Sequence, residues 1–123
     1  MFKTLVIIGI GGSLGSISRY LTSILIERYY TSFFPWATLI VNILGCFLIG
    51  LAIGYLEKHQ MTNDNIKWFF VTGFCGGFTT FSAFGVENIR LLQNGNFPMA
   101  VLYIGSSVIL GLASVSLGLA LAK

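Results

Sequence analysis

Four long apolar runs make up most of the chain, and polar residues gather between them. The runs extend roughly over residues 4–26, 36–56, 68–92 and 97–122. Each is about as long as the 20 residues that a helix needs to cross a bilayer. None alternates in polarity over about ten residues, as the strands of a membrane β-barrel do. The pattern therefore predicts an all-α membrane protein, in which residues 1–123 form a single domain of four transmembrane helices.

The segments between the runs carry the signals that end and restart helices. The second run is followed by EKHQMTNDNIK, the most hydrophilic stretch of the chain, and the fourth is preceded by QNGNFP. In QNGNFP the Asn-Gly pair breaks a helix, and Pro98 is typical of a helix start. The first run follows Met-Phe-Lys as in a signal peptide, but Arg19 interrupts it and no Ala-x-Ala cleavage site follows. We therefore expect this run to be a retained span.

Composition narrows the class of protein further. Of the 123 residues, 55% are apolar and 9% are charged, and the mean hydropathy is +0.86. A soluble domain of this size cannot bury so much apolar surface. Four spans leave no room for a soluble catalytic domain, so we do not expect an enzyme. Four short helices also enclose little space, so we expect an oligomer.

The charged residues bear on topology and on partners. Four lysines fall on the side of the termini and middle loop, and two or three arginines fall toward the other: Lys3, Lys58, Lys67 and Lys123 against Arg28, Arg90 and Arg19. This weak bias fits termini inside, or a chain that inserts both ways and pairs antiparallel.

The basic residues are scattered, which excludes nucleic-acid binding. Cys46 and Cys75 lack metal-ligand spacing, and His59 is the only histidine, so no zinc or iron site is expected.

Small residues recur at a spacing of four in several runs. The pairs are Gly11 and Gly15, Gly50 and Gly54, and Ser114 and Gly118. Such spacing lets helix backbones approach closely in lipid. Because glycine is common in membrane helices, each pair alone is a weak signal.

The third run contains the most informative segment, GFCGGFTTFSAFGVEN. Gly73, Gly76 and Gly77, followed by Thr79 and Thr80, make poor helix sequence. One interpretation is a helix broken near the bilayer midplane. Its freed carbonyls must then be buried, face water or hold a cation such as Na⁺. The other interpretation is a close helix crossing that requires small residues.

Phe81 and Phe84 come after the glycines and threonines of this segment, three residues apart and so on one helical face. Two phenylalanines in a membrane helix commonly pack against lipid or core. Alternatively, their electropositive ring edges line a pathway and hold a small anion. An edge, unlike a full charge, also lets the anion leave.

Other polar residues of the runs are mostly hydrogen-bond donors. Asn42 lies deep in the second run and offers two N–H groups, and Thr38 lies one turn before it. Tyr103 and Ser107 are four apart in the fourth run. Serine and threonine can simply bond their own helix carbonyls, but a buried amide without partners is costly in lipid. Together these groups are suited to replace the water of a strongly hydrated anion. Glu87 follows the third run's apolar stretch, and the other runs lack a deep carboxylate. The sequence therefore offers few groups that could bind and release a proton within the membrane, which disfavours a proton-coupled carrier.

Three segments in order, GGSLGSISRY, TLIVNILGCFLIG and GFCGGFTTFSAFGVEN, resemble the Fluc (CrcB) family of fluoride channels over nearly the whole chain. The resemblance implies a fluoride-selective channel of the cell membrane that exports fluoride passively and so relieves its toxicity. It also implies a dual-topology antiparallel homodimer with two antiparallel pores and a central structural Na⁺ at the dimer interface.

The resemblance also assigns roles to residues. The fluoride pathway would be lined by Phe81, Phe84, Asn42, Thr38, Thr80, Ser82, Tyr103 and Ser107. The backbone carbonyls of Gly76 and Thr79 would hold Na⁺, and Arg19 would have a vestibule or structural role. The chain departs from the family pattern at Ala37 and Ala83, and at Gly111, where some members carry another serine of the polar track.

Two other functions compete with this one. A small four-span multidrug or cation exporter also works as an antiparallel dimer, but that family needs a membrane-embedded glutamate in its first span, and the first run here holds Arg19 instead. A structural membrane subunit with no transport role would tolerate apolar replacements of its buried polar groups.

Overall fold

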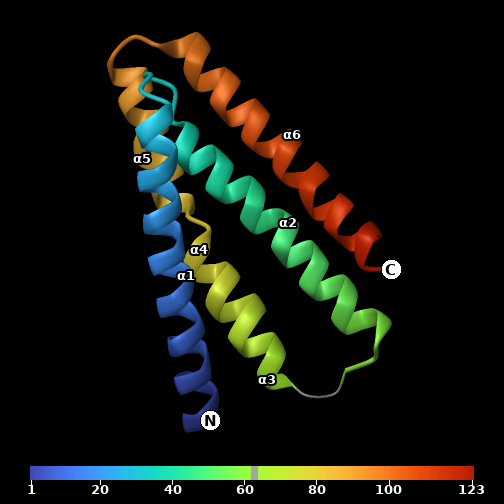
Figure 1. Cartoon of the computed structure of the whole chain (residues 1–123). Helices are drawn as coiled ribbons and strands as arrows, with labels where there is room; N and C mark the ends of the chain where they lie inside the picture. Colours follow the sequence, from blue (N-terminus) through green and yellow to red (C-terminus); the bar gives the residue numbers. More distant parts are fainter. Residues whose placement is uncertain (62–63) are drawn as a thin grey trace.

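The computed structural model describes residues 1–61 and 64–123, and every regular element among them is helical. Helix α1 spans Phe2–Tyr29, α2 spans Trp36–Lys58, and α6 spans Phe97–Ala122 (Figure 1). The third span is divided into α3 (Asp64–Ile66), the π-helix η1 (Lys67–Cys75), α4 (Gly76–Phe78) and α5 (Phe81–Gln93). Four stretches of the described chain are long and apolar enough to cross a membrane: Phe2–Tyr29, Trp36–Lys58, Asp64–Gln93 and Phe97–Ala122. The predicted all-helical membrane fold is confirmed.

The helices reach a little beyond the apolar runs at several ends. Helix α1 continues to Tyr29 and so includes Glu27 and Arg28, and α2 continues to Lys58. Long charged side chains at a span end can place their head groups in water while their stems cover the helix. The turn before α6 forms as its sequence predicts, with Gly95 at a φ of 79°, a conformation that glycine adopts easily.

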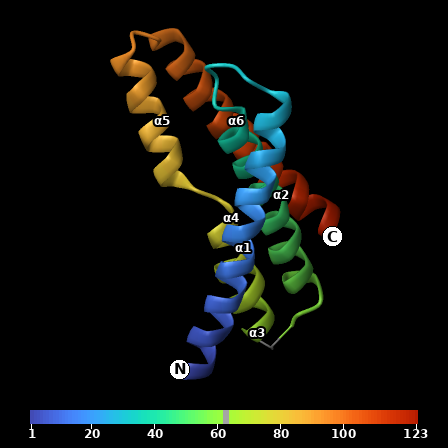
Figure 2. The same ribbon diagram turned by 60° about the vertical axis from the view of Figure 1, so that its left-hand side comes forward.

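The helices form two closely packed pairs. Helix α2 runs beside α6, and α1 runs beside η1 and α4 (Figures 1 and 2). Helix α5 continues from α4 after a break and contacts the first part of α6 near the Asn94–Gly95 turn. Figure 2 shows that this second half of the third span lies away from the line of the first half. Because of the break, the first half of the third span packs against α1 and the second half packs against α6.

Glycines bring α1 and η1 into backbone contact. A Cβ added at Gly11 would meet the carbonyl of Phe69, and one at Gly15 would meet the carbonyl of Phe74. From the other side, a Cβ at Gly77 would lie 2.5 Å from the carbonyl oxygen of Gly12. No side chain fits in such a space, so this crossing requires glycine.

Both interpretations of the glycines in the third span are correct, at different residues. Gly73 and Gly77 face α1 and form the close crossing, whereas a Cβ at Gly76 would meet nothing within 4 Å. The chain also leaves the helical conformation just after them, at Thr79 (φ −82°, ψ 158°) and Thr80 (φ −149°, ψ 118°). The predicted break of the third helix is therefore confirmed, near the middle of that span.

The small buried core lies where α2, α5 and α6 meet. It contains Leu39, Leu91, Ala100 and Tyr103, with Phe84 and other partly buried residues packed against it. Large apolar side chains such as Leu102, Ile109 and Leu112 are more than 60% exposed. Side chains of this kind are stable when they face lipid, so the exposed surface agrees with a membrane protein.

Candidate functional site

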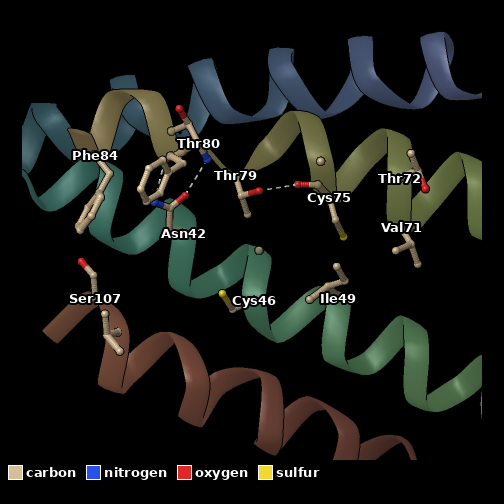
Figure 3. A pocket seen from close by; sticks show the side chains of 14 residues that line it. Asn42, Cys46, Ile49, Val71, Thr72, Cys75, Thr79, Thr80, Phe84 and Ser107 are labelled. Atoms are coloured by element: carbon tan, nitrogen blue, oxygen red, sulfur yellow. Dashed lines mark hydrogen bonds between the residues drawn. The ribbon is translucent and has the colours of Figure 1, made fainter. Parts of the chain in front are cut away.

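One cavity of about 470 Å³ lies on the side of the break where the second, third and fourth spans converge. It is lined by residues of α2, η1, α4, α5 and α6, among them Asn42, Gly76, Thr79, Phe84 and Ser107 (Figure 3). The two cysteines, Cys46 and Cys75, also lie on it and are both free thiols. The cavity thus brings together residues that are up to 66 positions apart (Asn42 to Val108).

The break is held in place by a side chain of α2, Asn42, and by the side chains of its own two residues, Thr79 and Thr80. The backbone N–H of Thr80 donates to Oδ1 of Asn42 at 2.8 Å, and Nδ2 of Asn42 donates to the carbonyl of Thr80 at 3.0 Å (Figure 3). The hydroxyl of Thr80 accepts from the N–H of Ala83 and so caps α5, a common role for threonine. The hydroxyl of Thr79 donates to the carbonyl of Cys75 at 2.9 Å.

These bonds leave two carbonyls without their usual helical donors. In a continuous α-helix the carbonyl of Gly76 would accept from the N–H of Thr80, and that of Thr79 from the N–H of Ala83. Those two N–H groups donate instead to Asn42 and to the Thr80 hydroxyl. Gly76 and Thr79 both line the cavity, and carbonyls freed by a helix break are a recurring kind of cation ligand.

Aromatic rings continue the cavity along α5. Phe81 is 82% exposed, and its ring lies 5.6 Å from that of Phe84. Phe84 in turn packs against Tyr103, 5.0 Å between ring centroids with the planes tilted by 59°. The hydroxyls of Thr80 and Ser82 lie 3.3 Å apart at the start of α5. The predicted pathway residues Phe81, Phe84, Thr80 and Ser82 therefore lie together.

A carboxylate that sequence reasoning set aside lies at the end of this row. Glu87 accepts a hydrogen bond from the hydroxyl of Thr38 at 2.9 Å and another from the hydroxyl of Tyr103 at 2.9 Å. Thr38 and Tyr103 are both buried. The signal for Glu87 was its spacing, because it lies three residues after Phe84 and so on the same helical face. Its position inside a membrane span was a second signal.

A second cavity of about 280 Å³ opens beyond Glu87, near the loop between α1 and α2. Glu27, Trp36, Glu87 and Arg90 are among its lining residues. Because Glu87 lines this cavity and Phe84 lines the first, the Thr38–Glu87–Tyr103 cluster lies between the two.

Two further predicted site residues, Arg19 and Ser107, differ in where they lie relative to the two cavities. Arg19 lies on α1, half-buried, and lines neither of these two cavities. Ser107 lines the first cavity, while its neighbour Ser106 donates to the carbonyl of Tyr103, as a serine satisfying its own helix does. The vestibule or structural role of Arg19 stays a prediction.

Known proteins resemble this chain over nearly its whole length. Residues 6–119 match the family described as CrcB-like protein, Camphor Resistance (CrcB). A protein of Flavobacterium psychrophilum named fluoride-specific ion channel FluC is 52% identical over 121 residues, 98% of either chain. Proteins of the same name from Azobacteroides pseudotrichonymphae (49% identical, 96% of this chain and 94% of its own) and Phocaeicola vulgatus (46%, 95% and 96%) are also similar.

Proposed function

The chain belongs to the CrcB family, and on this basis we propose that it is a fluoride-selective channel through which fluoride leaves the cell passively. It is a multi-pass membrane protein and a channel, not an enzyme. The observation that carries the proposal is the row of donors and ring edges that joins the two cavities across α5. Fluoride is small and strongly hydrated, so a pathway for it has to replace water with closely placed donors.

Each part of the row supplies a different kind of donor. Asn42, with its second N–H, Thr80 and Ser107 line the first cavity, and the hydroxyl of Ser82 lies 3.3 Å from that of Thr80. The ring edges of Phe81 and Phe84 follow, and they attract an anion without a full charge. Weak, repeated binding of this kind permits both entry and exit.

The carboxylate of Glu87 occupies the last donors of the row. Thr38 and Tyr103 donate to Glu87, and fluoride needs the same two hydroxyls. An ionised carboxylate also repels an anion at short range. Fluoride therefore passes this point when Glu87 turns away from the hydroxyls or takes up a proton.

We propose further that two copies of the chain assemble antiparallel, with two pores. Phe81 is 82% exposed and Ser82 is also exposed, although both belong to the pathway. Hydrocarbon is a poor neighbour for hydroxyls and free carbonyls, and a second copy over this face would cover them. The weak bias of lysine and arginine permits insertion in both directions.

A structural Na⁺ at the centre of this dimer is the remaining part of the proposal. The carbonyl oxygens of Gly76 and Thr79 fit a hard cation, since their usual donors bond elsewhere. Two such oxygens from each copy make four. Bound there, Na⁺ would neutralise the carbonyl dipoles and hold the two copies together.

Fluoride efflux from liposomes that contain only this protein, followed with a fluoride electrode, tests the function. We expect rapid fluoride efflux while chloride stays inside. No fluoride flux from well-folded protein would overturn the proposal. Exchange of protons for a cationic drug would instead favour the small four-span exporter. That exporter requires a glutamate deep in its first span, whereas Glu27 lies in the last turn of α1 and is exposed.

A further inference from the structure

The carboxamide of Asn42 pairs with one backbone residue through both of its polar groups. It accepts from the N–H of Thr80 at 2.8 Å and donates to the carbonyl of Thr80 at 3.0 Å. Thr80 is extended (φ −149°, ψ 118°), and the N–H and C=O of an extended residue point to the same side, as in a pair of antiparallel strands. A carboxamide offers a donor and an acceptor side by side, whereas a carboxylate or a hydroxyl does not offer this pair.

This pairing controls whether the carbonyl of Gly76 is free. If Thr80 were helical, its N–H would donate to Gly76. Because Asn42 takes that N–H, the Gly76 oxygen keeps no helical donor. The Thr80 hydroxyl can accept from Ala83 only while Thr80 caps α5, so the carbonyl of Thr79 depends on the same conformation. Both carbonyls therefore depend on Asn42.

The same carboxamide also serves the anion pathway. Nδ2 carries two N–H groups and uses one of them on Thr80. Asn42 lines the first cavity together with Phe84 and Ser107. Its second N–H is thus the group that can meet an anion in that cavity.

We propose that Asn42 is a positioning residue that couples the two ions: it holds Thr80 extended, so that Gly76 and Thr79 present their carbonyls to Na⁺, while its other N–H serves fluoride. This inference rests on the proposed channel and its Na⁺. By linkage, Na⁺ stabilises the conformation in which Asn42 is fixed, and loss of Asn42 weakens Na⁺ binding by the same free energy.

The test is a Na⁺ titration of thermal unfolding. The full chain, purified in detergent, is melted over a series of NaCl concentrations with N-methylglucamine chloride making up the ionic strength. Asn42→Ala removes both hydrogen bonds, and Asn42→Asp, nearly the same shape, replaces the donor by an acceptor that faces the Thr80 carbonyl. We expect the Na⁺ concentration that gives the same rise in melting temperature to be about tenfold higher in both variants.

Ser106→Ala is the control, because Ser106 donates to the carbonyl of Tyr103 on its own helix and makes no bond to the break. We expect it to bind Na⁺ as the unsubstituted chain does. Wild-type Na⁺ binding by the two Asn42 variants would overturn the inference, as would the absence of any Na⁺ response in the unsubstituted chain. The titration does not depend on fluoride, so a chain that binds Na⁺ but carries no fluoride would contradict the proposed function alone.

If Asn42→Ala does not fold, the Na⁺ titration of Asn42→Asp still tests the inference. Fluoride flux of the variants at rising Na⁺ is the second measurement. Because both variants also lack the N–H that serves fluoride, we expect only part of the lost flux to return at high Na⁺. A flux defect that does not change with Na⁺ concentration overturns the coupling.

Discussion

The two halves of the third span hold their neighbours by different means. Before the break, η1 and α4 meet α1 backbone to backbone, with Gly11, Gly15 and Gly77 at the contact. After the break, α5 meets α2 and α6 through side chains, with Glu87 bonded to two hydroxyls. A glycine contact has no polar side chain that could bind an ion, whereas hydroxyls released by a carboxylate are free to bind one. The first half therefore packs closely as a support, and the second half carries the residues of the proposed pathway.

The largest expected effect is on the rigid half. Gly15→Ala places a methyl group against the carbonyl of Phe74. Backbone cannot give way as a side chain can, so we expect a loss of about 3 kcal/mol in unfolding free energy, or failure to fold. Thermal unfolding and the yield of monodisperse protein measure it.

Gly9→Ala is the matched control on the same helix, because its added methyl meets nothing within 4 Å. We expect it to be neutral or to stabilise α1 by up to about 1 kcal/mol. Equal loss of stability in both variants would contradict the claim that α1 and η1 meet through their backbones.

The second largest effect should be on fluoride conduction along α5, the half of the third span after the break. Phe84→Ile removes the ring edge between Phe81 and Tyr103. We expect fluoride flux to fall by about tenfold or more, while the fold loses less than about 1.5 kcal/mol. Liposome efflux and thermal unfolding of the same preparation separate the two. Flux equal to that of the unsubstituted chain would return Phe84 to ordinary packing.

A smaller effect should follow from Glu87→Gln. Glutamine keeps an oxygen acceptor for a hydroxyl but lacks the charge, and hydrogen bonds to a neutral group are weaker by about 1 kcal/mol. Thr38 and Tyr103 are then released more easily, so we expect fluoride flux to rise by about fivefold. Glu27→Gln, an exposed carboxylate on the second cavity, is the control that changes charge without touching those hydroxyls. A rise of the same size in both variants would attribute the effect to the charge of the cavity alone.

The same contrast explains how far the sequence predicts the molecule. Apolar runs and the Gly-Gly-Phe-Thr-Thr segment predict four helices and a break, because lipid allows few alternatives for an exposed backbone. The shared face of Phe81 and Phe84 also follows from helical spacing, whereas the contact of Phe84 with Tyr103 depends on how α5 and α6 pack. The pairing of Asn42 with Thr80 and the bonds to Glu87 did not follow. They join residues 38, 49 and 16 positions apart along the chain, and they depend on how α2, α5 and α6 are placed in space.

Gly76→Ala should have the smallest effect on the stability of a single chain. It also distinguishes a monomer from the proposed dimer. A methyl group at Gly76 meets nothing within 4 Å in one chain, so the stability of that chain should change by less than about 1 kcal/mol, as for Gly9→Ala. In the proposed dimer, Gly76 lies at the central Na⁺, where the second copy approaches. The fraction of dimer at low protein-to-lipid ratio, measured by single-molecule photobleaching, should therefore fall for Gly76→Ala and not for Gly9→Ala. If both variants assemble alike, the second copy does not cross at the break.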